Sequence, residues 1–255
     1  MKLTFLGTGT SQGVPVIACH CGVCISVDER DKRLRTSALL TMDDNTNILF
    51  DIGPDFRQQM LCHNIGHLEA ILITHAHRDH VGGLDDIRSF NYVQHSKMEI
   101  FLNDIARNAI ERDYHYIFEP HQFPGLPEAN MHTVENEPFT AGGVTVVPIH
   151  AMHKDLPIMA YRIGGLAYVT DANKIAPKEI DKIKGVDTLV INALRQQKHF
   201  SHYSLPEALD VIKQVAPRQA FITHISHEMG RHAEVEPTLP SGVRLAYDNL
   251  EVEIC

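Results

Sequence analysis

The segment "THAHRDH" contains four candidate metal ligands within six consecutive residues: His75, His77, Asp79 and His80. They directly follow a run of apolar and β-branched residues that indicates a buried strand, and a loop at a strand end can turn all four side chains toward one point. Imidazole and carboxylate together suit zinc, manganese or iron rather than calcium. The segment therefore predicts a metal site, with a polar turn of exposed histidines as the alternative. These four side chains can contribute ligands to two metal sites, but two sites need further ligands from elsewhere in the chain.

A second reactive stretch, "CHCGVC", places three cysteines and a histidine in residues 19–24. Three thiolates at this spacing can occupy three corners of the tetrahedron around a structural zinc, which then needs a fourth ligand. His20, inside the stretch, is a local candidate for that ligand. A redox pair of Cys21 and Cys24 is the other interpretation, but the strand-to-helix context typical of such a pair is missing.

The overall composition supports metal chemistry. The 255 residues include 17 histidines, more than packing or surface decoration would require, and only five cysteines, three of them crowded together. This cysteine usage is unlike the disulfide framework of a small secreted domain, so we expect reduced thiols and a cytoplasmic protein. No stretch approaches the roughly 20 apolar residues of a membrane span. A net charge of −9 argues against nucleic acid as a partner.

Many short elements must position these residues. Strand-like runs that end in Gly, Pro or Asp recur along the chain, with fewer amphipathic helical segments between them, such as "NDIARNAIERDYHYI" (103–117). The pattern predicts an α/β fold whose sheets are covered by helices on their outer faces. No linker stands out, so we expect one domain over residues 1–255. The segment "FEPHQFPGLPEAN" (118–130) indicates an exposed loop or an insertion near a site.

The segment "THAHRDH" resembles the H-x-H-x-D-H signature of the metallo-β-lactamase superfamily. The resemblance implies an αββα sandwich, two mixed β-sheets flanked by helices, with a metal site at one edge where the sheets meet. It also implies ligands from strand ends in the second half of the chain. Seven side chains would then hold two divalent ions, zinc or manganese. The first ion would be bound by His75, His77 and His153, and the second by Asp79, His80 and His224. Asp171 would bind both ions.

Two of these positions have alternatives. His150 competes with His153, which we favour because "KDLPIMAYRI" after it resembles the return strand that follows this ligand in the superfamily. Asp51, at the end of "NILFDIG", matches an aspartate that usually supports the ligands from behind, and a helix N-cap or turn is its other interpretation. A ligating histidine needs such an orienting carboxylate on its second ring nitrogen.

Two further stretches resemble the phosphodiesterase branch of the superfamily. "KLTFLGTGTSQGVP" resembles the opening of tRNA 3′-processing endonucleases and cyclic phosphodiesterases, and His202 in "HFSHYSLPEAL" matches their general acid. Cleavage of a P–O bond expels an alkoxide, which is a poor leaving group unless it is protonated. The resemblance implies a dinuclear metal-dependent phosphodiesterase with His202 and Asp79 as catalytic residues. Its substrate would be a small phosphodiester, a cyclic ribose phosphate being one candidate. A lactonase or thioesterase on the same fold and a metal-stabilised RNA-binding protein are the alternatives, and a homodimer stays open.

The cysteine stretch adds a closer resemblance, to the PhnP-like phosphoribosyl cyclic phosphate phosphodiesterases. Their early C-x-C-x2-C cluster is completed by the second histidine of a "THISH" segment. The resemblance implies that one structural zinc is bound by Cys19, Cys21, Cys24 and His227. Because His227 lies three residues beyond His224, one loop would serve both metal sites. Histidines without companion spacing, such as His232, and His199 near the general acid, are expected to be surface or loop residues.

Overall fold

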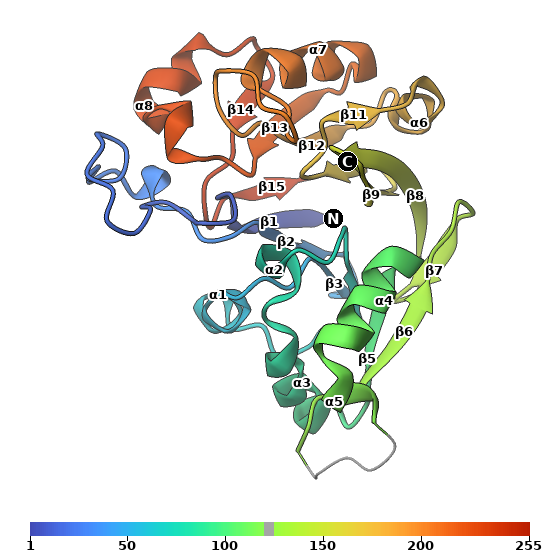
Figure 1. The fold of residues 1–255 in the computed structure, drawn as a ribbon. Coiled ribbons are helices and arrows are strands. Elements are labelled where there is room, and N and C mark those ends of the chain that lie inside the picture. The colour runs from blue at the N-terminus through green and yellow to red at the C-terminus, as the bar shows by residue number, and fades with distance from the viewer. Residues whose placement is uncertain (120–124) are drawn as a thin grey trace.

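The computed structural model describes residues 1–119 and 125–255, in which two β-sheets pack against each other and helices cover both outer sides (Figure 1). The arrangement is the αββα sandwich that the sequence predicts, so this prediction is confirmed. The segment 118–130, expected to be a loop, lies partly outside the described residues, and its last two residues begin a strand.

Among the described residues, the first sheet has seven strands in the order β15-β1-β2-β3-β4-β5-β6. Pairing is antiparallel from β15 to β3 and parallel from β3 to β6, so the sheet is mixed. Its strands are β1 (Lys2–Gly7), β2 (Ser37–Thr41), β3 (Asn47–Phe50), β4 (Ala70–Leu72), β5 (Met98–Leu102), β6 (Ala129–Thr133) and β15 (Glu251–Glu253).

The second sheet runs in the order β11-β8-β9-β10-β12-β13-β14, and β7 pairs with β8 beside it. Pairing is antiparallel from β11 to β10 and parallel from β10 to β14. Its strands are β7 (Phe139–Ala141), β8 (Val144–His153), β9 (Leu156–Ile163), β10 (Leu166–Val169), β11 (Lys174–Ile175), β12 (Thr188–Asn192), β13 (Gln219–Thr223) and β14 (Val243–Leu245).

The helices lie outside the two sheets (Figure 1). On the side of the first sheet are α1 (Phe56–His63), α2 (Arg78–Val81), α3 (Ile87–Gln94), α4 (Asp104–Asp113) and α5 (His115–Phe118). On the side of the second are α6 (Pro177–Ile183), α7 (Leu205–Val215) and α8 (His232–Val235). Short 3-10 turns are η1 (Glu29–Asp31), η2 (Leu84–Asp86), η3 (His227–Met229) and η4 (Glu236–Thr238). None of the helices in the described residues is long and apolar enough to cross a membrane.

Strand β3 shows how the sandwich is held together. Because successive side chains of a strand alternate between faces, Ile48 and Phe50 enter the apolar layer between the sheets, whereas Leu49 packs under the helices. Phe50 stacks on Tyr168 of the second sheet, with 4.4 Å between the ring centroids. Burial of each large apolar side chain contributes about 1.5–3 kcal/mol. This layer fixes the two sheets relative to each other, and hence the loops at their common edge.

The structure corrects the helix predicted over residues 103–117. α4 ends at Asp113 and α5 begins at His115, because Tyr114 leaves helical geometry with φ −118° and ψ 34°. The Tyr114 side chain is buried, and its hydroxyl donates to the carbonyl oxygen of Val81 at 2.9 Å. This long-range contact connects α4 and α5 to α2. The spacing of apolar residues within the segment gives no information about such a contact.

Candidate metal centre and active site

The predicted ligands converge at one edge of the sandwich, where loops leave the strands. His75 follows β4 by three residues, Asp171 follows β10 by two, and His224 follows β13 directly. Asp51, Asp171 and His224 all have a left-handed backbone, with φ of 58°, 58° and 55°. Residues other than glycine adopt this conformation at a cost of about 1–3 kcal/mol, and such strain gathers at functional sites. The left-handed backbone conformations therefore occur at the same edge of the sandwich as the candidate ligands.

The first group of candidate ligands is His75, His77 and His153, whose ligand atoms lie within 4.8 Å of one another. Nε2 of His75 is 3.0 Å from Nδ1 of His77. His153 ends β8 and donates its Nδ1–H to the carbonyl oxygen of Ser201 at 2.8 Å. Because this hydrogen bond places the proton on Nδ1, the lone pair of Nε2 is free to bind a metal. His150 does not belong to this group.

The second group of candidate ligands is Asp79, His80, Asp171 and His224, again within 4.8 Å. His80 donates its Nδ1–H to Oδ2 of Asp51 at 2.7 Å. The opposite nitrogen, Nε2, is buried without a hydrogen-bond partner and faces Asp79 at 3.2 Å and Asp171 at 3.1 Å. Asp51 was interpreted either as a carboxylate that orients a ligand or as a helix N-cap or turn residue. The structure supports the first interpretation, because Asp51 accepts a hydrogen bond from the second ring nitrogen of His80.

The electrostatics of the second group fit a bound cation. Burial alone would raise the pKa of Asp79, but the charge of His80 outweighs it and holds the pKa below its usual range. Burial would lower the pKa of His80, yet Asp79, Asp171 and Asp51 together raise it well above normal. In the described residues these three carboxylates form ion pairs with histidines only. Buried carboxylates without a lysine or arginine partner, facing an unpartnered imidazole nitrogen, are the donor set of a divalent metal.

His202 lies beside both groups. Its Nε2 is 2.9 Å from Oδ1 of Asp171, and its ring stacks on His224 with 5.1 Å between the centroids. Residue Ser204, two positions later, caps α7 in a reciprocal capping box with Glu207, which holds the segment in place. The side chain of His202 is 12% exposed, so it is held firmly but reaches solvent.

His199 is a site neighbour that the sequence analysis missed, since it was expected to be a loop residue. Its Nδ1 is 3.2 Å from Nδ1 of His202 and 3.3 Å from the hydroxyl oxygen of Ser201. The spacing of the two histidines in "HFSH" was the available signal. His232 was also expected to be a surface or loop residue, and this is wrong: it begins α8, it is buried, and its backbone N–H donates to Asp31 at 2.7 Å.

The cysteine stretch meets His227 at a second candidate metal site. Nδ1 of His227 lies 3.3 Å from Sγ of Cys19 and 3.4 Å from Sγ of both Cys21 and Cys24. Three nearly equal contacts of this length suit a tetrahedral zinc with S and N bonds of about 2.0–2.3 Å. A hydrogen bond from the backbone N–H of Cys24 lowers the pKa of the Cys21 thiol to about 6, whereas burial raises the pKa of the Cys24 thiol to about 11. Of this pair, the thiolate is therefore favoured at Cys21. All three cysteines are free of disulfides.

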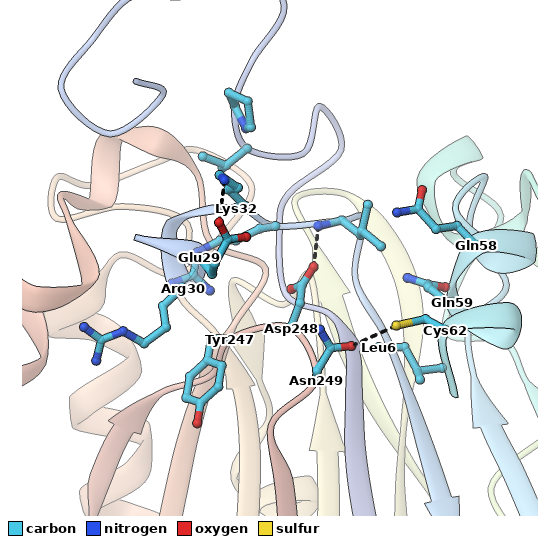
Figure 2. A pocket seen from close by; sticks show the side chains of 14 residues that line it. Leu6, Glu29, Arg30, Lys32, Gln58, Gln59, Cys62, Tyr247, Asp248 and Asn249 are labelled. Carbon is cyan, nitrogen blue, oxygen red and sulfur yellow. Dashed lines mark hydrogen bonds and ion pairs between the residues drawn. The ribbon is translucent and has the colours of Figure 1, made fainter. Parts of the chain in front are cut away.

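Two cavities differ in whether a candidate metal ligand is among the described residues that line them. The cavity in Figure 2 encloses about 480 Å³ between η1, α1 and the turn before β15, and no candidate ligand is among the described residues that line it. A second hollow, of about 580 Å³, lies directly against Asp79. Among the described residues that line these two cavities, Asp79 is the only candidate ligand, so the second hollow adjoins the metal centre and the first cavity does not.

Asp248, which lines the cavity of Figure 2, carries a prediction about stability. Burial raises the pKa of its carboxyl group from 3.8 to about 6. Since the folded-state pKa lies above the unfolded one, the contribution of this group to stability is full below about pH 4 and is lost as the pH rises through 6. Relative to the wild type, Asp248→Asn should gain about 1–2 kcal/mol of unfolding free energy between pH 4.5 and pH 8.

Urea unfolding at the two pH values measures this difference, with Asp43→Asn as the control because Asp43 is almost fully exposed. A relative stability of Asp248→Asn that does not change with pH would contradict the buried, titrating carboxyl group.

The chain is similar in sequence to several known proteins. Residues 46–225 match the family model described as a beta-lactamase superfamily domain. A protein named octanoyltransferase, from Porphyromonas gingivalis (strain ATCC BAA-308 / W83), is 41% identical over an alignment of 256 positions that covers 100% of this chain and 52% of that protein. Coenzyme PQQ synthesis protein B of Xanthomonas axonopodis pv. citri (strain 306) is 26% identical over 185 residues, 65% of this chain and 56% of that protein. The chain thus spans about half the length of these curated relatives.

Solved structures are similar over the whole chain. A crystal structure described as a new diphosphatase from the PhnP family is 36% identical, with a TM-score of 0.91, and the match covers 100% of this chain and 98% of that chain. Zn²⁺-bound PqqB from Methylobacterium extorquens is 19% identical, with a TM-score of 0.73 and 100% of both chains covered. The second likeness concerns the fold alone.

Proposed function

The chain belongs to the β-lactamase superfamily, and from this premise we propose that it is a dinuclear metal-dependent hydrolase that cleaves a P–O bond in a small phosphodiester. The similarity to a PhnP-family diphosphatase supports this reaction class, since that activity also breaks a P–O bond. A net charge of −9 favours a small molecule over a nucleic acid as the substrate. The cyclic ribose phosphates stay one candidate.

The two groups of ligands described above would hold the metals. His75, His77 and His153 would bind the first ion, Asp79, His80 and His224 the second, and Asp171 both. When bound, the ions would supply Lewis-acidic charge beside the phosphorus and an activated water as nucleophile. Asp51 keeps the Nε2 of His80 directed at the centre through its bond to Nδ1.

The position of His202 is the observation that carries the proposal. It belongs to neither of the two groups above, but it forms a further group of possible ligands with His153 and Asp171, and its ring contacts His153 and His224. An imidazole at this place can donate a proton to the oxygen that departs from phosphorus, and Asp171 at 2.9 Å stabilises the protonated ring. A thioester has less need of such an acid, because its thiolate leaving group departs without a proton.

A substrate panel tests the reaction class. The purified holoprotein would be assayed against bis(p-nitrophenyl) phosphate, ribose 1,2-cyclic phosphate, a diphosphate diester, a homoserine lactone and a glutathione thioester. We expect turnover of the phosphorus substrates at least about 100-fold above the carbon substrates in kcat/KM. Preference for the lactone or the thioester would overturn the proposal in favour of the alternatives. Full metal content without turnover, together with salt-dependent RNA binding, would favour the RNA-binding alternative.

We also propose that Cys19, Cys21, Cys24 and His227 bind a structural zinc. Cys21→Ser should lower the metal content from about three ions per chain to about two and reduce the free energy of unfolding by at least about 2 kcal/mol, because zinc binding here adds to folding stability. His227→Ala should behave in the same way. Metal analysis and urea unfolding measure both effects.

Cys62→Ser is the matched control, because Cys62 is an exposed free thiol outside the cluster. If Cys21→Ser keeps three ions per chain, the cluster does not bind zinc.

A further inference from the structure

The segment from His199 to His202 brings three polar side chains together. Nδ1 of His202 lies 3.0 Å from the hydroxyl oxygen of Ser201 and 3.2 Å from Nδ1 of His199, and these two partner atoms are 3.3 Å apart. The opposite nitrogen of His202, Nε2, faces Oδ1 of Asp171 at 2.9 Å. Both nitrogens of the His202 ring therefore have polar partners, and the partners of Nδ1 come from its own segment.

The backbone fixes the direction of these hydrogen bonds. The backbone N–H of Ser201 donates to Nδ1 of His199 at 3.4 Å, so this nitrogen is an acceptor and the ring of His199 carries its proton on Nε2. A histidine that acts as a general acid delivers a proton from one ring nitrogen and carries a second N–H on the other. With Nε2 as the donor to the leaving group, the Nδ1–H of His202 meets two acceptors, the Ser201 hydroxyl oxygen and Nδ1 of His199. The hydroxyl hydrogen of Ser201 can be donated to His199, so every polar hydrogen of the cluster has a partner.

Ser201 serves the acid and a candidate ligand with different atoms. Its carbonyl oxygen accepts the Nδ1–H of His153 at 2.8 Å, whereas its hydroxyl contacts His202. The residue is 5% exposed, and the carbonyl oxygen of the preceding Phe200 accepts from Nδ2 of Asn173 at 3.1 Å. Because the side chain is buried on an anchored backbone, its hydroxyl is oriented without the help of a substrate.

We propose that Ser201 is the positioning residue of the general acid, and that its hydroxyl, supported by His199, holds the His202 ring with Nε2 directed at the oxygen that leaves phosphorus. The arrangement follows the logic of a catalytic triad, in which a third group orients the proton-transferring histidine through its other ring nitrogen. This inference rests on the proposed function, because His202 is needed as an acid only where a poor leaving group departs. Ser201 and His199 would act through His202 rather than on the substrate.

Ser201→Ala removes the hydroxyl and keeps the carbonyl oxygen that His153 uses. With ribose 1,2-cyclic phosphate, whose leaving group is a sugar alkoxide, kcat should fall about 10- to 100-fold, the range of a hydrogen bond to a charged group. With bis(p-nitrophenyl) phosphate the fall should be about threefold or less, because p-nitrophenolate leaves without a proton. KM and the metal content should stay unchanged. The control is Ser89→Ala, since Ser89 is an exposed residue of α3.

Two substitutions of His199 differ in one acceptor atom. His199→Phe keeps a planar ring but removes Nδ1, so kcat for the cyclic phosphate should fall about three- to tenfold. His199→Asn places an amide oxygen close to the position of Nδ1 and should restore most of this loss. A role in packing alone predicts the reverse order, because the ring of His199 packs on Phe200 with 4.4 Å between the centroids.

No loss in Ser201→Ala, or an equal loss on both esters, would overturn the positioning role. His202→Ala separates this failure from a failure of the proposed function. A loss that depends on the leaving group in His202→Ala but not in Ser201→Ala contradicts the positioning role alone, whereas its absence from both variants contradicts the acid as well.

If neither ester is turned over, ¹⁵N NMR of the zinc-loaded protein measures the hydrogen bond without turnover, with the His202 signals assigned from His202→Gln. The Nδ1 signal of His202 should move in Ser201→Ala and keep its position in Ser89→Ala. An unmoved signal in Ser201→Ala would overturn the proposal.

Discussion

Asp171→Asn is expected to abolish turnover, with kcat/KM lowered at least about 1,000-fold and the metal content of the centre reduced. Asp171 is the carboxylate that would join the two groups of ligands. Its oxygens lie 3.1 Å from Nε2 of His80 and 3.1 Å from Nε2 of His224, both in the second group, and its ligand atom also lies within 4.8 Å of that of His153 in the first. Asparagine keeps the size of the side chain but removes its charge. It also presents N–H groups to nitrogens that must bind a cation.

Metal analysis and steady-state kinetics at saturating metal measure this loss, and circular dichroism checks that the variant is folded. Asp155→Asn is the matched control, since Asp155 is exposed and pairs only with Lys154 at 3.7 Å. An Asp171→Asn protein that retains all its metal and acts within about tenfold of the wild type would exclude a bridging role for this carboxylate.

His202→Ala should show a loss that depends on the leaving group. With an alkyl phosphodiester we expect kcat to fall about 100- to 10,000-fold, because the departing alkoxide is no longer protonated. With a p-nitrophenyl ester the fall should be about tenfold or less, since p-nitrophenolate leaves without a proton. The metal content should stay unchanged, because the two groups that would bind the ions are complete without His202. Since His202 also forms a group of possible ligands with His153 and Asp171, a loss of metal would instead assign it to metal binding.

The comparison requires kcat for both substrates in the wild type and the variant. His67→Ala serves as the control, because His67 is an exposed histidine that contacts Glu69 and belongs to none of the groups of possible ligands. An equal loss on both substrates would assign His202 to structure or metal binding rather than to proton transfer.

Sequence alone was most informative where the groups are close in the chain. His75, His77, Asp79 and His80 lie on one loop and one turn of helix, so their spacing already limits how far apart they can be. The same holds for the three cysteines in residues 19–24. The resemblance of these motifs to the superfamily and the αββα fold are both confirmed. The single domain over residues 1–255, the cytoplasmic location and the individual roles of the ligands stay predictions.

The resemblance to the superfamily indicated the distant ligands His153, Asp171, His224 and His227, but only the tertiary structure showed which distant residues lie beside these motifs. His150 and His153 are three residues apart on β8, so they point to opposite faces, and only the packing of that strand shows which face meets the centre. The same applies to His199 beside His202. Contacts of this kind depend on how the strands pair and how the two sheets pack, and local spacing carries no information about either.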